Sequence, residues 1–477
     1  MSSQSLPDRY DQAHQALQAA DQSHLLTFYD RLPEDGRARL LDQVEAHDWT
    51  YLAELIETHV TSAPGMALAG GITPAPCYPA RPDSEQRDKY DAARALGCEM
   101  IGDGRIAAFT VAGGQGSRLG WDGPKGCYPA TPIGRKSLFE VFAQYLLKIQ
   151  EKYRSRIHWY VMTSPINDQA TRDFFSTHNH FGLEPKQVQF FPQGTLPSFS
   201  LDGRALLAAP DELAVNPDGH GGSLRALFTS GALDEMSGLG IDQISYFQVD
   251  NPAVRCIDPL FVGLHALDQA QMSSKMIPKA TAEEKVGVFV EQEGHIAVIE
   301  YSDLPDDLAR ETDGQGQLRF NAGSIAIHMI EVDFVRQLNQ GRFALPPHRA
   351  VKKVPHVDLE TGERAEPKQA NAVKLETFVF DALPLCRTSI VLETERAEEF
   401  APIKNADGAD SPETSCRIQI ERAARWLESR GVQIPRRPDG ETDARIEISP
   451  LTAIEPTDLE QIVDLPAAVE PAQTLLI

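Results

Sequence analysis

Strands and helices alternate along the segment from residue 105 to residue 251. The apolar runs RIAAFTVAG, IHWYVMTS, QVQFFPQG and QISYFQVDN are typical of buried strands. Stretches with helical periodicity lie between or beside them, at residues 136–153, 168–182 and 223–240. Consecutive parallel strands need crossovers of this length, and such crossovers are right-handed. The alternation therefore predicts an α/β fold built on a parallel, doubly wound sheet.

The pattern of apolar residues changes on both sides of this segment. Residues 25–57 show helical periodicity without strand alternation, and a connector rich in proline and glycine follows at residues 64–83. The run KVGVFVEQEGHIAVIEYS predicts a hairpin with its turn near Gly294. A chain of 477 residues is also too long for one compact core. We expect three parts: an N-terminal helical domain at 1–97, a core at 98–400, and a small C-terminal domain or tail at 401–477.

Charge and composition exclude several classes of protein. The formal net charge of −24 argues against a general nucleic-acid binder, because such proteins need a basic face to neutralise phosphates. The sequence has no run of 18 apolar residues, so we expect no membrane span, and the polar start MSSQSLPDRY lacks an apolar signal core. The six cysteines are scattered without a CxxC pair, which predicts reduced thiols in a cytoplasmic protein.

A glycine-rich loop, 109-FTVAGGQGSRLGWDGPKG-126, follows the first of these strands. It does not match the dinucleotide fingerprint G-x-G-x-x-G, because the third glycine comes one place late, at Gly120. It does not match the P-loop G-x-x-x-x-G-K-[ST] either, because Lys125 lies between Pro124 and Gly126. A nicotinamide-dependent oxidoreductase is therefore disfavoured.

The loop does fit a third pattern, G-G-x-G-[ST]-R-L-x(5)-P-K. Glycines without Cβ atoms let a backbone wrap closely around a nucleotide, and successive N–H groups in such a loop bind anions. Arg118 and Lys125 add two positive charges, which suits a nucleoside triphosphate and a leaving pyrophosphate. The competing interpretation is a tight glycine turn with a surface arginine and lysine. The combination predicts nucleotide contacts from three glycines, Gly113, Gly114 and Gly116.

The loop VAGGQGSRLGWDGPKGCYP closely resembles the signature of the eukaryotic-type UDP-sugar pyrophosphorylase (UDPGP) family, above all its UDP-N-acetylhexosamine branch. The resemblance implies a nucleotidyltransferase fold with a Rossmann-like doubly wound mixed sheet core, flanked by N-terminal helical and small C-terminal domains. It extends over most of the chain, through the ordered segments YDRLPEDGRARLLDQVEAHDW, WYVMTS, FFPQGTLPSFSLDGR, PDGHGGSLRAL, YFQVDNP, VGVFVEQEGHIAVIEYSDL, FNAGSIAIH, AVKLETFVFDAL, FAPIKNADG and EISPL.

The reaction that the resemblance implies joins UTP to a sugar 1-phosphate and releases pyrophosphate. The sugar phosphate oxygen attacks the α-phosphorus of UTP, so catalysis depends on positioning and charge neutralisation. The matching positions imply four catalytic cations, Arg118, Lys125, Lys374 and Lys404. Asp250 ends the strand ISYFQVD, and in the family's VDN motif it would hold Mg²⁺ or Mn²⁺. Taken alone, Asp250 could equally be a strand-end residue that caps the next turn.

The same resemblance assigns residues to the base and to the sugar. Gln193 would read the uracil edge through its amide, and the backbone of Gly219 would press against the base. The sugar contacts would come from His220, Gly287, Glu300 and Asn321. At His220 the chain departs from its branch, which has asparagine where this chain has histidine in PDGHGG. Histidine is typical of glucose-type and broad-specificity enzymes, so the sugar stays open.

The sequence leaves several functions in competition. The leading interpretation is a uridylyltransferase that uses UTP and N-acetylglucosamine 1-phosphate. The alternatives are an enzyme for glucose 1-phosphate or for several sugar phosphates, and a non-catalytic sugar-nucleotide sensor. A sensor is disfavoured because it need not keep cations for a leaving pyrophosphate. The expected partners are these small molecules, without nucleic acid or membrane, and the expected state is a monomer or a weak homo-oligomer.

Overall fold

The computed structural model describes residues 5–62 and 71–477. The predicted connector at 64–83 therefore lies partly outside the described residues. The chain divides into two compact units. The first unit combines the N-terminal segment with Gln193–Ser223 and Leu345–Val379, and the second unit contains Gly70–Pro192, Leu224–Ala344 and Phe380–Ile477.

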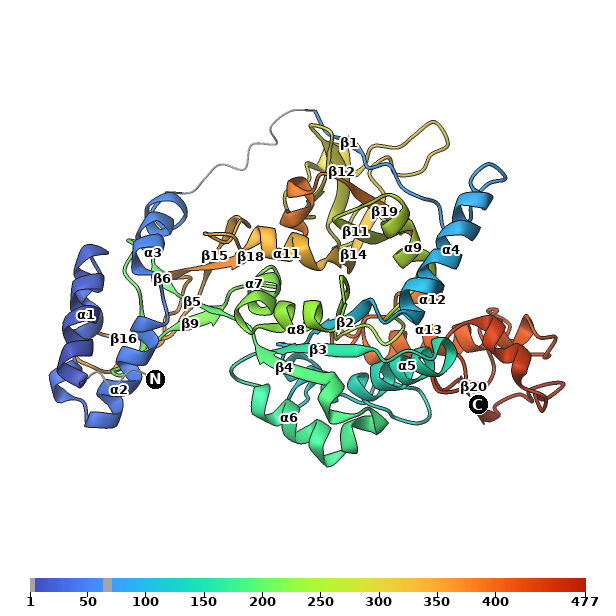
Figure 1. The fold of residues 1–477 in the computed structure, drawn as a ribbon, viewed down its shortest axis with the longest axis horizontal. Coiled ribbons are helices and arrows are strands. Elements are labelled where there is room, and N and C mark those ends of the chain that lie inside the picture. Colours follow the sequence, from blue (N-terminus) through green and yellow to red (C-terminus); the bar gives the residue numbers. More distant parts are fainter. Residues whose placement is uncertain (1–4, 63–70) are drawn as a thin grey trace. The chain divides into compact units, whose positions relative to one another are not determined.

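The second unit is built on a ten-stranded mixed sheet, as the family resemblance implied (Figure 1). Four strands are parallel, in the order β4 (Val188–Pro192), β3 (His158–Thr163), β2 (Ile106–Val111) and β10 (Gln243–Gln248). The antiparallel part begins where β14 pairs with β10. Its members are β14 (Ala322–Glu331), β11 (Met272–Pro278), β12 (Val288–Gln292), β13 (His295–Ile299) and β1 (Thr73–Pro74), with β19 (Ser389–Glu393) running parallel to β11.

The parallel strands reverse their order beside β2. From β2 the chain proceeds to β3 and then β4 on one side, whereas β10 returns to the other side of β2. Ligands in open α/β sheets bind at the carboxyl ends of the strands where the order reverses. The glycine-rich loop follows β2 and Asp250 follows β10, so both lie at this point.

Helices cover the sheet of the second unit. They include α4 (Arg87–Gly102), α5 (Leu138–Tyr153), α6 (Asp168–Thr177) and α9 (Pro259–Leu267). The predicted helix at 136–153 is α5, which begins where the Ser137 side chain accepts from the N–H of Glu140. The predicted helix at 223–240 is two helices, α7 (Gly222–Thr229) and α8 (Ala232–Gly238), because Gly231 between them has φ 78°.

The hairpin and the C-terminal region are both ordered. Strands β12 and β13 form the predicted hairpin, with its turn at Glu293 and Gly294. After the short helix α12 (Arg396–Glu399), the chain forms α13 (Pro412–Glu428), and β20 (Arg445–Glu447) pairs in parallel with β21 (Thr474–Leu476). A small apolar cluster that includes Trp426, Leu427 and Ile446 joins these elements. Across the described residues, every helix is too short or too polar to cross a membrane.

The first unit packs N-terminal helices against strands from later segments. The helices are α1 (Leu6–Ala19), α2 (Glu34–Glu45) and α3 (Trp49–Leu55), and the three-stranded sheet has the order β15 (Pro347–Lys352), β18 (Ala372–Thr377) and β6 (Phe199–Ser200) (Figure 1). Their shared core includes Leu17, Leu40, Trp49, Phe199 and Leu375.

Candidate active site

The glycine-rich loop after β2 is closed by its own backbone. The N–H of Gly116 donates to the carbonyl of Gly123 at 2.9 Å, and the N–H of Lys125 donates to Gly114 at 3.1 Å. A Cβ at Gly116 would lie 2.6 Å from the Trp121 ring, so only glycine fits there. A Cβ at Gly114 would meet no atom within 4 Å, which leaves its backbone open to a ligand.

Two cations belong to this closed loop. Arg118 is exposed and Lys125 is half-buried. In the described part of the chain, neither forms a salt bridge within 4.0 Å, so both charges are available to an anion. The loop thus presents open backbone and two unpaired cations, a combination that suits a polyphosphate.

A residue that the sequence analysis missed fixes the start of this loop. Asn167, between β3 and α6, is completely buried. Its Nδ2 donates to the carbonyls of Ala112 at 3.0 Å and Gly114 at 3.3 Å, while its Oδ1 accepts from the N–H of Ser164 at 2.7 Å. In the sequence, an asparagine before a helix indicates only a helix start, and nothing in its spacing indicated a contact more than fifty residues back.

Asp250 and Lys404 lie together at the end of β10. The N–H of Val249 donates to Val111 in the neighbouring β2 at 3.1 Å, which brings the Asp250 segment beside the start of the loop. The N–H of Ile403 donates to the carbonyl of Asp250 at 2.8 Å, so the adjacent Lys404 is held at the same place. Two predicted site residues that are distant in the sequence are therefore neighbours.

A second carboxylate, Asp410, accompanies this pair and was also missed. Its Oδ2 lies 4.0 Å from Nζ of Lys404. Burial raises the pKa of Asp410, Lys404 opposes that rise, and the charge of Asp250 adds to it. Carboxylate oxygens are the ligands that Mg²⁺ prefers. Among the described residues, no group of three or more His, Cys, Asp or Glu side chains could hold a metal ion, so a metal here would complete its shell with water and substrate phosphates.

Three of the four predicted sugar contacts lie on the antiparallel part of the second unit. A Cβ at Gly287 would be 3.4 Å from Oε1 of Glu300, so the carboxylate stands beside this glycine at the base of the hairpin. The hairpin pairs with β14 at Gly323, two residues after Asn321, and the Asn321 carbonyl accepts from the N–H of Lys279 at 2.8 Å. Gly287, Glu300 and Asn321 thus gather around one junction of strands.

The remaining predicted residues belong to the first unit. Gln193 is buried there, and Lys374 is half-buried on β18. Gly219 has φ 86°, and a Cβ on it would lie 2.3 Å from the Thr377 carbonyl, so the loop contacts β18 through bare backbone. The N–H of Gly221 donates to that carbonyl at 2.8 Å.

His220 is a neutral, stacked side chain in this loop. Its Nδ1 accepts from the N–H of Val379 at 3.1 Å, which places the proton of the neutral ring on Nε2. The ring stacks on Phe378 with centroids 5.2 Å apart, and Phe378 also stacks on His348. Burial and the nearby His348 lower the pKa of His220 to about 4. The side chain can donate a hydrogen bond near neutral pH, but it carries no charge.

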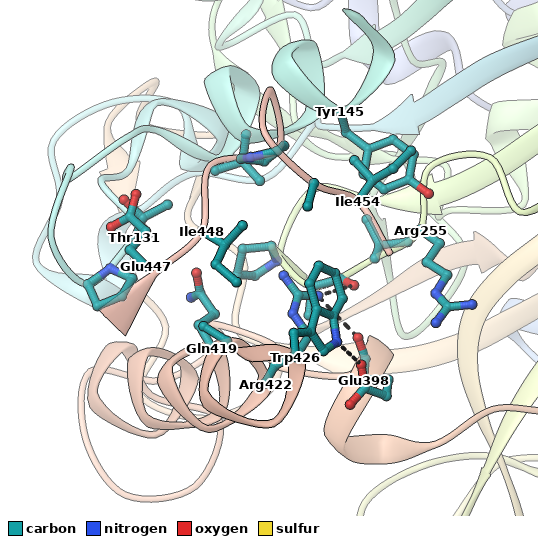
Figure 2. A pocket seen from close by; sticks show the side chains of 18 of the residues that line it. Thr131, Tyr145, Arg255, Glu398, Gln419, Arg422, Trp426, Glu447, Ile448 and Ile454 are labelled. Atoms are coloured by element: carbon teal, nitrogen blue, oxygen red, sulfur yellow. Dashed lines mark hydrogen bonds between the residues drawn. The ribbon is translucent and has the colours of Figure 1, made fainter. Parts of the chain in front are cut away.

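A small cavity of about 40 Å³ lies elsewhere in the second unit, and Figure 2 shows it between Tyr145, Arg422 and Ile454. A cavity of this size holds only a few water molecules. None of the predicted site residues lines it, so it is not the place for a sugar nucleotide.

Comparisons with known proteins identify the relatives of this chain. The model of the UTP–glucose-1-phosphate uridylyltransferase family matches residues 84–411. UDP-N-acetylhexosamine pyrophosphorylase-like protein 1 of Homo sapiens is 35% identical over 474 residues, which cover 93% of each chain. UDP-N-acetylglucosamine pyrophosphorylase of Saccharomyces cerevisiae is 39% identical over 346 residues, or 70% of this chain and 72% of the yeast protein.

Two solved structures have the same fold. The uridine diphosphate N-acetylglucosamine pyrophosphorylase of Trypanosoma brucei, solved in complex with an inhibitor, aligns with a TM-score of 0.83 at 26% identity and covers 100% of this chain and 99% of its own. A putative UDP-N-acetylglucosamine pyrophosphorylase of Entamoeba histolytica aligns with a TM-score of 0.75 at 30% identity, over 85% of this chain and 100% of its own.

Proposed function

The chain belongs to the UTP–glucose-1-phosphate uridylyltransferase family, and we propose that it makes UDP-N-acetylglucosamine and pyrophosphate from UTP and N-acetylglucosamine 1-phosphate. The observation that carries this proposal is the meeting of the open glycine loop, Asp250 and Lys404 where the strand order reverses. N-acetylglucosamine appears in the names of UDP-N-acetylglucosamine diphosphorylase 2 of Arabidopsis thaliana and of the yeast UDP-N-acetylglucosamine pyrophosphorylase.

The glycine-rich loop after β2 binds the nucleotide. Its backbone N–H groups and the free cations Arg118 and Lys125 bind the β- and γ-phosphates of UTP. As the bond from the α-phosphorus to the bridging oxygen breaks, negative charge grows on the departing pyrophosphate, and the same cations stabilise it. Gln193 and Gly219 hold the uracil, and buried Asn167 keeps the loop in shape.

The α-phosphate is the place where the two substrates react. Asp250 would hold Mg²⁺, which would supply charge neutralisation at that phosphate when bound. Lys404, on the neighbouring backbone, neutralises the oxygens of the phosphate groups, and the family resemblance assigns the same task to Lys374. The phosphate oxygen of the sugar attacks in line, so these residues position and neutralise without forming a covalent bond to the substrate.

The sugar is assigned to Gly287, Glu300, Asn321 and His220. The Glu300 carboxylate accepts from vicinal hydroxyls, and an amide such as Asn321 suits the acetamide. His220 does not require a glucose-type substrate. Its Nδ1 accepts a backbone N–H, which an asparagine oxygen in the same position would also do, so the histidine replaces the asparagine of the acetylhexosamine branch without changing this contact.

We further propose a cytoplasmic enzyme that acts as a monomer or a weak homo-oligomer. All six cysteines are free thiols, which suits a reducing compartment.

The sugar preference is tested by pyrophosphate release from UTP with N-acetylglucosamine, N-acetylgalactosamine and glucose 1-phosphates at matched concentrations. We expect the highest kcat/KM with N-acetylglucosamine 1-phosphate, by about tenfold or more over glucose 1-phosphate, because the amide contact is lost with glucose. A higher kcat/KM with glucose 1-phosphate would reject the proposed substrate. No release with any sugar would favour the sensor.

A further inference from the structure

Two chain segments that are distant in sequence meet beside the proposed metal ligand. One is residues 250–253, which begin two residues after β10, and the other is residues 398–404, which include the end of α12. Asp250 belongs to the first and Lys404 to the second, and the N–H of Ile403 donates to the carbonyl of Asp250. The placement of one segment against the other therefore sets the placement of the Asp250 carboxylate against the Lys404 ammonium.

A buried asparagine joins these two segments. Asn251 is 6% exposed. Its Nδ2 donates to the carbonyl of Glu399 at 2.8 Å, and its Oδ1 accepts from the N–H of Ala401 at 3.0 Å and from the N–H of Ala253 at 3.2 Å. One side chain thus binds the main chain of both segments with both ends of its amide, which fixes their distance and their orientation.

An arginine from the C-terminal region makes a second tie between the same segments. Arg422 on α13 donates from Nη1 to the carbonyl of Ala253 and to the carbonyl of Glu398, each at 3.1 Å. Figure 2 shows Arg422 and Glu398 close together beside the small cavity. The two ties lie on neighbouring residues, so the junction is held on both sides.

Behind Asn251 the second segment is fastened to the sheet by a buried charge cluster. Glu399 is fully buried, and its carboxylate accepts from Nζ of Lys275 at 2.7 and 2.8 Å and from the Thr394 hydroxyl at 2.8 Å. Lys275 lies on β11 with 1% exposure and also donates to Asp258 at 2.7 Å. Strand β11 therefore anchors Glu399, whose carbonyl accepts the hydrogen bond from Asn251.

A buried charge cluster of this kind contributes little to the free energy of folding. Apolar side chains of similar volume often give equal or greater stability than buried ion pairs, because charges must lose their water. Buried polar groups do fix the orientation of the segments that carry them, since each donor and acceptor needs a hydrogen-bond partner. The cluster and Asn251 hold the segments that carry the Asp250 carboxylate and the Lys404 ammonium, the two groups that need accurate placement.

We propose that Asn251 is a positioning residue for the transfer reaction, setting Asp250 and Lys404 at the separation that the α-phosphate requires. This inference rests on the proposed function. Asn251 acts through its neighbours, because its three hydrogen bonds all go to the main chain of the two segments. Its loss should therefore impair the chemical step more than the binding of UTP.

The test compares two buried asparagines of the second unit. Asn251→Ala removes the tie, and Asn339→Ala removes a buried asparagine that donates to the carbonyls of Leu224 and Val335 at 3.2 and 2.8 Å, neither of which is a predicted site residue. For each variant, kcat and KM for UTP and N-acetylglucosamine 1-phosphate are measured by pyrophosphate release across a Mg²⁺ series. UTP binding without metal and the thermal unfolding midpoint are measured alongside.

We expect Asn251→Ala to lower kcat by about 10- to 100-fold, the usual size of an effect exerted through a neighbouring ligand. The Mg²⁺ concentration for half-maximal activity should rise, while metal-free UTP binding changes by less than about threefold. Asn339→Ala should keep kcat within about twofold of wild type. We expect this even if its thermal unfolding midpoint falls as far as that of Asn251→Ala.

Equal changes of kcat in the two variants would overturn the inference, as would a wild-type kcat in Asn251→Ala. If Asn251→Ala fails to fold, the same measurements are made on Arg422→Met. This variant loses the hydrogen bonds to the carbonyls of Ala253 and Glu398 but keeps a long apolar side chain. A reduced kcat with unchanged metal-free UTP binding supports the inference, and a wild-type kcat overturns it. Absence of pyrophosphate release by the wild-type chain would reject the proposed function itself.

Discussion

At the scale of single residues, the candidate site separates groups that shape the backbone from groups that meet the substrates. Gly116 keeps the loop closed against Trp121, and Asn167 pins its first carbonyls. The side chains of Arg118 and Lys125 form no salt bridge with any residue that the structure describes. Their charges are therefore free for the substrate.

Asp250 is the residue on which the proposed metal depends. We expect Asp250→Asn to lower kcat for pyrophosphate release by about 100-fold or more, because the developing charge at the α-phosphate loses its neutralising partner. The thermal unfolding midpoint should stay within a few degrees. Asp303→Asn is the matched control, since it removes one exposed carboxylate from the same unit and should leave kcat unchanged. Wild-type kcat in Asp250→Asn would remove this residue from the mechanism.

His220 allows a prediction about pH. Its pKa is lowered to about 4, whereas an unfolded histidine titrates near 6.5. The stability that neutral His220 contributes is therefore complete above about pH 6.5 and is lost as the pH falls through about 4. Urea denaturation at pH 7 and pH 4.5 should show that His220→Asn loses less stability than wild type, by about 2 kcal/mol. Identical losses would show that His220 titrates normally.

At the scale of elements, close helix packing fixes one side of the sheet. Helices α4 and α9 meet through two glycines. A Cβ at Gly97 would lie 1.8 Å from the Pro259 carbonyl oxygen, and one at Gly263 would lie 1.7 Å from that of Ala93. The two backbones therefore approach more closely than any side chain allows.

Substitution within α4 tests this packing. Gly97→Ala should lower the free energy of unfolding by about 1–3 kcal/mol, because the helices must move apart. Gly102→Ala lies in the same helix, and its Cβ would come no closer than 3.8 Å to another atom. It should be neutral or stabilise by up to about 1 kcal/mol through helix propensity. Chemical denaturation of both variants gives the comparison, and equal effects would show that α4 and α9 are not tightly packed.

Periodicity predicted those elements whose environment is uniform along their length. The buried parallel strands, helix α5 and the β12–β13 hairpin all appear near their predicted positions, because apolar runs and turn residues mark them locally. The break at Gly231 escaped prediction, since a single glycine in a helical pattern is compatible with a continuous helix. The contacts of Asn167 and Asn251 escaped as well, because each joins segments that only the folded chain brings together.

At the scale of the whole molecule, the first unit takes strands from two later segments of the chain. Residues 193–223 and 345–379 pack with the N-terminal helices through Phe199 and Leu375. Both segments fall within the core that the sequence pattern predicted at 98–400. The family motifs singled out Gln193, Gly219, His220 and Lys374 as candidates, but they could not indicate that all four residues belong to the first unit.

The most direct test of the central claim is the stoichiometry of the products. Purified protein is incubated with UTP, N-acetylglucosamine 1-phosphate and Mg²⁺, and the UDP-sugar and pyrophosphate are quantified separately by chromatography and by a coupled assay. The account predicts equal amounts of UDP-N-acetylglucosamine and pyrophosphate, with neither formed when the sugar phosphate is omitted. Pyrophosphate without UDP-sugar, or consumption of UTP that does not depend on the sugar phosphate, would contradict it.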